Sequence, residues 1–271
     1  MCLILVAFRA HPVYPLIVAA NRDEAYARPA TPASFWNDHP GILAGRDQEK
    51  GGTWLGLSRR GRFAAVTNYR QGQAPRAAPR SRGDLTAGHL AGMEETTAYL
   101  ARVQRDAHLY NGYSLIAGDL GSLYFLSNRS GACSSIAPGV HGLSNHLLDE
   151  PWPKVRQGMK VLGGVLAAAE ADIIATLFHT LADRTEAADQ YLPATGVERP
   201  REKELSPIFI AAQRYGTRAS TVLLVSAAGD VYFSERSFGP QGAPLGTTEH
   251  RFALDAAVAE RGTLNAGRRA G

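Results

Sequence analysis

The sequence predicts an α+β fold built on antiparallel sheets. Helical spacing is confined to the middle of the chain, and no alternation of strand, helix and strand is seen. Paired β-like runs flank short turn signals at residues 53–58 and 62–68, 113–118 and 123–128, and 220–226 and 231–236. Hairpins at both ends of a chain without a β-α-β order are typical of antiparallel sheets with helices grouped beside them.

The first element expected is a buried strand at the start of the chain. Residues 3–8 are apolar and are followed by the turn-forming pair His11-Pro12. A second apolar run over residues 16–20 is expected to pair with the first as a hairpin. The start lacks the basic leader and long apolar stretch of a secretory signal, so none is expected.

The remaining elements follow from spacing and turn residues. Helices are expected from Asp84, over 94–107, from Asp149 to 166 and over 171–182, with a short strand at 140–144. Residues 29–52, 71–82 and 183–207 are expected to be loops because Pro, Gly or charged residues are frequent there. We expect a single domain over residues 1–255, followed by a small, polar, frayed tail over 256–271.

The composition excludes several classes of protein. The 271 residues are 45% hydrophobic and 20% charged, which is ordinary for a globular chain. The net charge is +4, and the arginines are scattered without interleaved aromatics, so no nucleic-acid partner is expected. No apolar run approaches the roughly 18 residues of a membrane helix, so no integral membrane segment is expected.

Cysteine and histidine usage excludes two further kinds of site. Cys2 and Cys133 are the only cysteines, too few for a disulfide framework, which indicates a reduced, cytoplasmic protein. There is no Cys-x-x-Cys pair, and the 8 histidines lack metal-ligand spacing. No metal site is therefore expected.

Cys2 is the first candidate for chemistry. Removal of Met1 would leave an N-terminal cysteine that carries a free α-amine and a thiol on one residue. The amine titrates near about 7.7–8.0 and a free thiol near about 8.5, so the amine can act as general base toward its own sulfur. The structural alternative is a buried thiol that packs as a small hydrophobe.

Polar residues at the expected strand ends form a second set of candidates. Arg22 and Asp23 end the second strand, Asn68 and Asn145 each end another, and Arg218 precedes the strand at 220–225. Taken singly, a surface ion pair or an asparagine turn accounts for each of them. Taken together with Cys2, they supply a nucleophile, its base, charged groups that orient the amine, and amide N–H donors for an oxyanion.

The chain resembles a known family through a series of short strings in order along it. These strings are Met1-Cys2, Asn21-Arg22-Asp23-Glu24, Gly51-Gly52-Thr53-Trp54, Thr67-Asn68-Tyr69-Arg70, Pro79-Arg80-Ser81-Arg82-Gly83, Gly142-Leu143-Ser144-Asn145, Pro151-Trp152-Pro153-Lys154 and Tyr215-Gly216-Thr217-Arg218. They resemble the NRDE family, named for its Asn-Arg-Asp-Glu motif, which includes proteins of the transport and Golgi organisation 2 type. The resemblance covers nearly the whole expected domain.

This resemblance implies the N-terminal nucleophile hydrolase fold, a four-layer αββα sandwich of two antiparallel sheets. By motif position it implies a catalytic set similar to that of the choloylglycine hydrolases and penicillin V acylases, namely Cys2, Arg22, Asp23, Asn68, Asn145 and Arg218. In this interpretation Asp23 holds the ammonium, the two asparagines stabilise the oxyanion, and Arg218 tunes the thiolate.

Two functions remain open on this basis. The first is hydrolysis of a small, linear, non-peptide amide after Met1 removal, which requires no cofactor. The alternative is a non-enzymatic carrier or trafficking protein that binds haem or a lipid in the same cleft. Neither the substrate nor the oligomeric state is predicted by the sequence.

Overall fold

The computed structural model describes residues 2–72, 77–131 and 133–255 of the chain. The first sheet contains β1 (Cys2–Phe8), β2 (Leu16–Ala25), β10 (Gly139–Leu143), β11 (Tyr215–Val225), β12 (Asp230–Phe238) and β13 (Pro244–Ala253). Their order across the sheet is β10-β1-β2-β11-β12-β13, and every neighbouring pair is antiparallel. The hairpins expected for β1 with β2 and for β11 with β12 are confirmed.

The second sheet contains β3 (Ala30–Phe35), β4 (Ile42–Asp47), β5 (Leu55–Ser58), β6 (Phe63–Asn68), β7 (Tyr113–Gly118), β8 (Leu123–Ser127) and β9 (Cys133–Ile136). These strands follow one another in sequence order across the sheet, and all neighbours are antiparallel. The expected hairpins of β5 with β6 and of β7 with β8 are confirmed.

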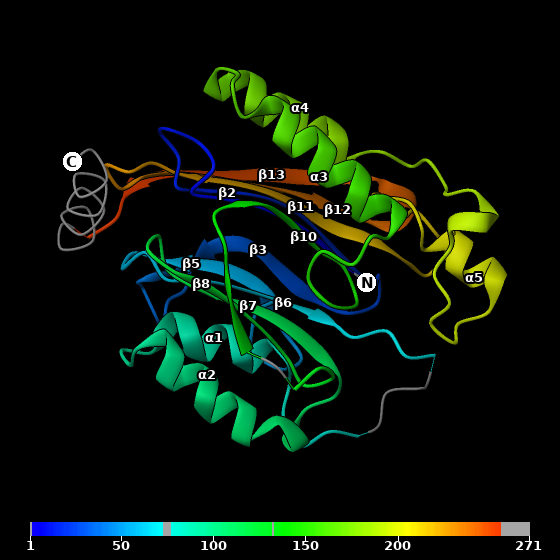
Figure 1. The fold of residues 1–271 in the computed structure, drawn as a ribbon, viewed down its shortest axis with the longest axis horizontal. Coiled ribbons are helices and arrows are strands. Elements are labelled where there is room, and N and C mark those ends of the chain that lie inside the picture. The colour runs from blue at the N-terminus through cyan, green and yellow to red at the C-terminus, as the bar shows by residue number, and fades with distance from the viewer. Residues whose placement is uncertain (1, 73–76, 132, 256–271) are drawn as a thin grey trace.

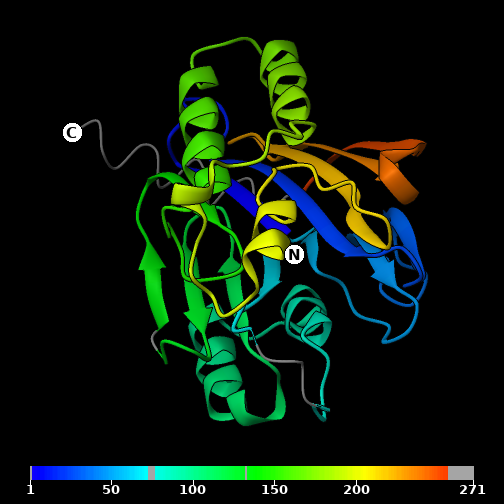
Figure 2. The ribbon, with the colours of Figure 1, turned by 90° about the vertical axis from the view of Figure 1, so that its right-hand side faces the viewer.

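Helices cover the outer face of each sheet. The helices α3 (Pro153–Val165) and α4 (Glu170–Leu181) lie over the first sheet, and α1 (Gly83–Ala91) and α2 (Thr96–Arg105) lie over the second (Figures 1 and 2). The six-residue helix α5 (Arg199–Glu204) lies beside the layers at one end (Figure 1). The predicted α+β class and the four-layer αββα sandwich are both confirmed.

β1 shows why the chain starts with an unbroken apolar run. Ile4 and Val6 face the core between the two sheets, whereas Leu3 and Leu5 face the core beneath α3 and α4. All four side chains are at most 1% exposed. A strand covered on both faces has no solvent side, so its sequence does not alternate.

The prediction of a loop over residues 29–52 is wrong, because this segment contains the strands β3 and β4. β3 is one of the two edge strands of its sheet, and its pairing with β4 shifts register between Thr31 and Ser34. An irregular edge strand accepts Pro32, which a central strand does not. The short strand β9 and the edge strand β13 were also missed, since most of their residues are exposed and lack an apolar face.

Two expected helix starts are also wrong. Asp84, expected as an N-cap, lies instead within the first turn of α1, which begins at Gly83, and its Oδ2 accepts a hydrogen bond from the Ser81 backbone N–H (3.2 Å). Asp149 does not begin a helix: its φ is 59°, and its carboxylate accepts a hydrogen bond from Gly142 N (2.8 Å). The helix begins at Pro153, whose fixed φ suits a first helical position.

The loop expected over residues 183–207 contains α5, which makes that prediction wrong in part. The tail predicted over residues 256–271 lies outside the described residues.

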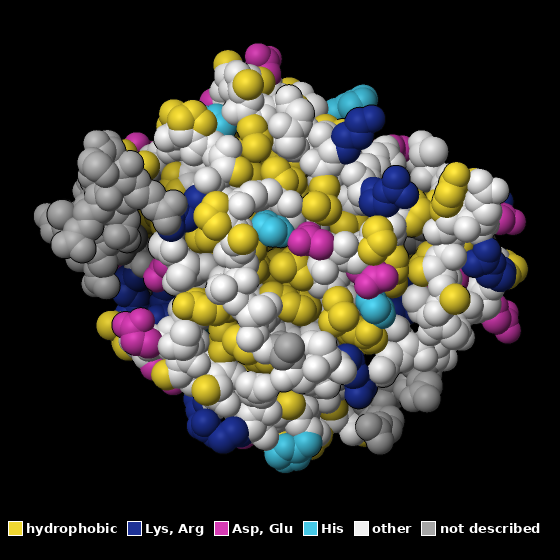
Figure 3. All heavy atoms as spheres, in the orientation of Figure 1, with side chains coloured by type: hydrophobic (Ala, Val, Ile, Leu, Met, Phe, Trp, Pro, Cys, Tyr) yellow, Lys and Arg dark blue, Asp and Glu magenta, His cyan; other side chains and the backbone are white. Residues whose placement is uncertain are grey.

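Within the described residues, no helix combines the length and the apolar character needed to cross a bilayer. On the face in Figure 3, acidic and basic side chains are interspersed among apolar ones.

Candidate active site

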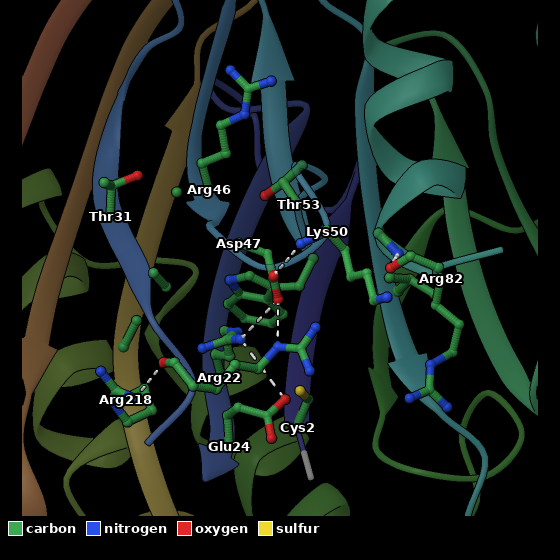
Figure 4. A pocket seen from close by; sticks show the side chains of 18 of the residues that line it. Cys2, Arg22, Glu24, Thr31, Arg46, Asp47, Lys50, Thr53, Arg82 and Arg218 are labelled. Carbon is green, nitrogen blue, oxygen red and sulfur yellow. Dashed lines mark hydrogen bonds and ion pairs between the residues drawn. The ribbon is translucent and has the colours of Figure 1, made fainter. Parts of the chain in front are cut away.

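Cys2 lies at the head of β1 and is 8% exposed. In the pairing of β1 with β2, its Cα lies opposite that of Arg22. Both residues line a cavity of about 880 Å³ whose walls also include residues of β3, β4, β6, β11, β12 and β13 (Figure 4). The volume lies within the range of small-molecule binding sites.

Asn145 joins the nitrogen of Cys2 to the end of β6. Its Oδ1 accepts a hydrogen bond from the Cys2 backbone N (3.1 Å), and its Nδ2 donates to the backbone O of Asn68 (3.1 Å). Ser144 Oγ donates to the backbone O of Cys2 (2.9 Å). Asn145 is fully buried, two residues beyond the end of β10, and Asn68 ends β6 as expected.

Arg22 and Asp23 lie on β2 before its end at Ala25 and leave opposite faces of the strand. Arg22 forms ion pairs with Glu24 (Nη2–Oε2 3.7 Å) and Asp47 (Nη2–Oδ2 3.8 Å). Asp23 is 2% exposed, and its Oδ1 accepts a hydrogen bond from Thr217 Oγ1 (2.7 Å). Asp23 also borders the cavity.

Arg218 borders the cavity, but its guanidinium is bonded to backbone carbonyls. Nη1 donates to the O atoms of Ala25, Tyr26 and Arg28 at 3.0–3.1 Å, and Nε donates to Phe238 O (3.2 Å). It lies within β11, at the register shift between Thr217 and Ala219, rather than before the strand. These contacts fix the segment that follows β2 (Figure 4).

Burial dominates the electrostatics of Cys2 and Asp23. It raises the pKa of the Cys2 thiol, while the positive charge of Arg22 and a hydrogen bond from the Asp23 backbone act in the opposite direction. It also raises the pKa of Asp23, against the charge of Lys154. Arg22, rather than Arg218, therefore supplies the guanidinium charge that favours the thiolate.

A buried charged cluster that was not predicted from the sequence lies behind the site. Lys154 is 3% exposed in the first turn of α3, and burial lowers its pKa to about 8 while the charge of Asp23 opposes that shift. Arg70 forms a buried ion pair with Glu202, which is 0% exposed. The sequence feature that could have indicated this cluster is Lys154 at the start of a helix. A cation there interacts unfavourably with the helix dipole, so a nearby negative charge is to be expected.

A hydrogen-bonded chain connects the segments that carry the two asparagines. Tyr69 Oη and His146 Nε2 are 2.7 Å apart, and His146 Nδ1 is 3.0 Å from Glu150 Oε2. The backbone N of Arg70 donates to Asn145 O (2.8 Å). This role of Tyr69, His146 and Glu150 was not predicted from the sequence.

The donor set offers little for a metal ion. In the described ranges, no group of three or more His, Cys, Asp or Glu side chains is placed to hold a metal. Of the described residues that line the cavity, Cys2 is the only Cys, His or Met.

The architecture and the site define an αββα protein with a cysteine at the head of a central strand, facing a cavity. The chain belongs to the transport and Golgi organisation 2 family, whose model matches residues 1–240. The transport and Golgi organization protein 2 homolog of Bos taurus is 40% identical over 275 residues, covering 94% of this chain and 99% of the relative. The homolog of Homo sapiens is 38% identical over 257 residues, covering 88% and 93%. The predicted family is confirmed.

Solved structures give two further similarities. A conjugated bile acid hydrolase from Clostridium perfringens, in its C2A mutant, has a TM-score of 0.48 and 7% identity, covering 94% of this chain and 92% of that chain. An N-acylethanolamine-hydrolyzing acid amidase ortholog from Caenorhabditis elegans has a TM-score of 0.45 and 12% identity, covering 82% and 92%.

Proposed function

We propose that the protein, once Met1 is removed, hydrolyses small linear amides with Cys2 as the nucleophile. The observation that carries this proposal is the setting of Cys2. Its nitrogen is hydrogen-bonded to Asn145 Oδ1 (3.1 Å), and the same residue lines the 880 Å³ cavity. After Met1 is removed, the Cys2 nitrogen is a free amine. Because it donates a hydrogen to Asn145, its lone pair stays available to accept the thiol proton.

The first step forms the thioester. The Cys2 amine takes the proton of its own Sγ, and the thiolate attacks the amide carbonyl carbon to form a C–S bond. The oxygen becomes an oxyanion, which the amide groups of Asn68 and Asn145 stabilise. The ammonium then gives its proton to the leaving nitrogen as the C–N bond breaks.

The second step releases the acid. The same amine takes a proton from water, hydroxide attacks the thioester carbon, and the C–S bond breaks as the sulfur regains its proton. The negative charge of Asp23 favours the ammonium in both steps, and the charge of Arg22 favours the thiolate. No cofactor takes part.

The test is a screen of N-acyl amides against processed protein, with loss of Met1 verified by intact mass. We expect Cys2→Ala to abolish turnover and Cys2→Ser to lower it by about 10³-fold. Cys133→Ser is the matched control, since the other thiol is exposed on β9, away from the cavity lining. Full turnover by Cys2→Ala on every responsive amide would end the proposal.

Haem or lipid carriage is the alternative proposal for the same cavity. If haem is the ligand, Cys2 is either a thiolate ligand to the iron or merely structural, and the described lining contains no other Cys, His or Met. Burial raises the pKa of its thiol and so disfavours the thiolate that iron prefers. A haem titration of wild type and Cys2→Ala tests this alternative: tight binding that needs Cys2, without amide turnover, would favour the carrier.

A further inference from the structure

The cavity wall carries an excess of positive charge. Among the described residues, seven Lys and Arg side chains line it, against five Asp and Glu side chains. Two of those carboxyl groups, Asp23 and Glu235, are almost fully buried, and burial raises the pKa of both. The cavity as a whole therefore favours an anionic ligand.

Most of the cavity arginines are already neutralised or occupied. The arginines with a carboxylate partner are Arg22, Arg28, Arg46 and Arg80. Arg218 is occupied differently, because its guanidinium donates to four backbone carbonyls. These groups are parts of the wall rather than free binding groups.

Arg82 is different. Its side chain is half-buried and donates from Nη1 to Gly112 O (3.2 Å), and no carboxylate in the described ranges lies within ion-pair distance of it. Burial lowers its pKa, which measures the cost of holding this cation away from water. A guanidinium stays charged regardless, so a bound anion would repay that cost.

The cavity has charged side chains on one wall and apolar side chains on another. Arg82 precedes α1, on the opposite side of the view from Arg218, and Cys2 lies between them in Figure 4. Phe238 and Leu245, from the far strands of the first sheet, supply an apolar wall. Leu245 is 66% exposed, although it is a large hydrophobic side chain.

We propose that the cavity binds amphipathic amides with an apolar group on one side of the scissile bond and a carboxylate on the other, and that Arg82 binds the carboxylate. This inference rests on the proposed hydrolase function for the identity of the reacting bond. The planar fork of one guanidinium matches the two oxygens of one carboxylate. Arg82 is thus a specificity-determining residue, and the anion preference is a property of binding that can be measured without turnover.

The experiment compares N-decanoylglycine with N-decanoylethanolamine, which share the acyl chain and differ in a carboxylate against a hydroxymethyl group. Binding of both is measured by calorimetry on Cys2→Ala, and kcat/KM is measured on the processed wild type. We expect the carboxylate compound to be preferred by about tenfold or more in both assays, since a charge-assisted bidentate contact contributes on this scale. The preference should weaken as salt is raised.

Arg82→Gln should reduce the ratio between the two compounds, in affinity and in kcat/KM, to about one. The change should come mainly from weaker binding and slower turnover of the carboxylate compound. Arg46→Gln is the matched control, because Arg46 also lines the cavity but is held by Asp38 through two bonds (Nη1–Oδ1 2.6 Å and Nη2–Oδ2 2.7 Å). This control should keep the preference. Circular dichroism and thermal melting of both variants establish that they are folded.

The outcomes separate the two proposals. Preferential binding of the carboxylate compound that depends on Arg82, without turnover of either compound, supports the anion site and contradicts the hydrolase. Turnover of both compounds at equal kcat/KM, unchanged in Arg82→Gln, supports the hydrolase and overturns the anion site. Failure of Cys2→Ala to bind the carboxylate compound more tightly than the neutral one also overturns the anion site.

Discussion

Tyr69 and His146 are hydrogen-bonded to each other, with Oη and Nε2 2.7 Å apart. Each directly follows one of the two asparagines of the site, Asn68 and Asn145, which are themselves linked by a hydrogen bond of 3.1 Å. Glu150 holds the other ring nitrogen of His146 at 3.0 Å. The Tyr69–His146 contact therefore fixes the spacing between the two segments that carry the proposed oxyanion donors.

Tyr69→Phe removes this contact while keeping the ring. We expect a loss of about 1 kcal/mol in the free energy of unfolding and a fall of about threefold to tenfold in kcat, with a smaller change in KM. Steady-state kinetics and urea unfolding measure the two effects. Tyr124→Phe is the control, since Tyr124 lies on β8 of the second sheet and does not line the cavity. Equal effects of the two substitutions on kcat would contradict a positioning role for Tyr69.

Asn145→Ala removes both the acceptor for the Cys2 nitrogen and the link to Asn68. We expect kcat to fall by about 10²–10³-fold, the usual cost of losing one oxyanion donor. Asn145→Asp restores the acceptor but places a second oxygen against the Asn68 carbonyl, so it should not restore activity. Rescue by Asn145→Asp would show that only the acceptor matters and would remove Asn145 from the oxyanion site.

Glu202→Gln tests the buried cluster behind the site. It leaves Arg70 without its carboxylate, and Arg70 Nε and Nη2 already lack hydrogen-bond partners within the described chain. We expect a loss of about 3–5 kcal/mol in the free energy of unfolding, measured by urea denaturation. Glu204→Gln is the control on the same helix, where the exposed pair with Arg201 should contribute no more than about 0.5 kcal/mol. Similar losses for the two variants would mean that burial of Glu202 is not the cause.

His89 gives the fold a defined sensitivity to acid. It is 0% exposed, its Nδ1 lies 3.0 Å from Arg62 Nη2, and burial lowers its pKa to about 4 from 6.5. The unfolded chain binds the proton more readily, so this stabilisation is present above about pH 6.5 and is lost as the pH falls toward about 4. Over that window we expect a loss of about 3 kcal/mol, at about 1.4 kcal/mol per pKa unit.

Urea unfolding measured at intervals between pH 7 and pH 4 checks this expectation, with His89→Gln compared against the wild type. The variant cannot titrate at this position, so its stability should fall less steeply over the same window. His179→Gln, at an exposed histidine of α4, should keep the slope of the wild type. Parallel curves for the wild type and His89→Gln would show that another group causes the acid sensitivity.

The parts of the fold predicted from sequence are those whose side chains have one clear environment. β1, β2 and the hairpins of β5 with β6, β7 with β8 and β11 with β12 carry apolar runs buried in the three hydrophobic cores. Edge strands such as β3 and β13 were missed because their residues are largely exposed. Local patterns do not identify a strand that is defined mainly by its neighbour in the sheet.

The site was predictable as a set of residue types but not in its detailed contacts. Hydrogen bonds bring Cys2, Asn145 and Asn68 together, while their catalytic roles stay predictions. The occupation of Arg218 by backbone carbonyls depends on how the segment after β2 folds back, which no local spacing encodes. Lys154 on α3 and Glu202 on α5 are far apart in the sequence, and the charge of Glu202 acts on Lys154 only because the fold brings them near each other.

Covalent labelling at Cys2 tests the central claim most directly. Processed protein is incubated with an acylating amide or lactam probe, and intact mass and peptide mapping locate the adduct. The matched control carries an N-terminal extension that stays attached to Cys2, so the thiol is kept while the free amine is lost. We predict one adduct per chain, on Cys2, formed at least about tenfold faster in the processed protein than in the extended one. Labelling that proceeds equally fast without the free amine, or that falls on Cys133 instead, would contradict the account.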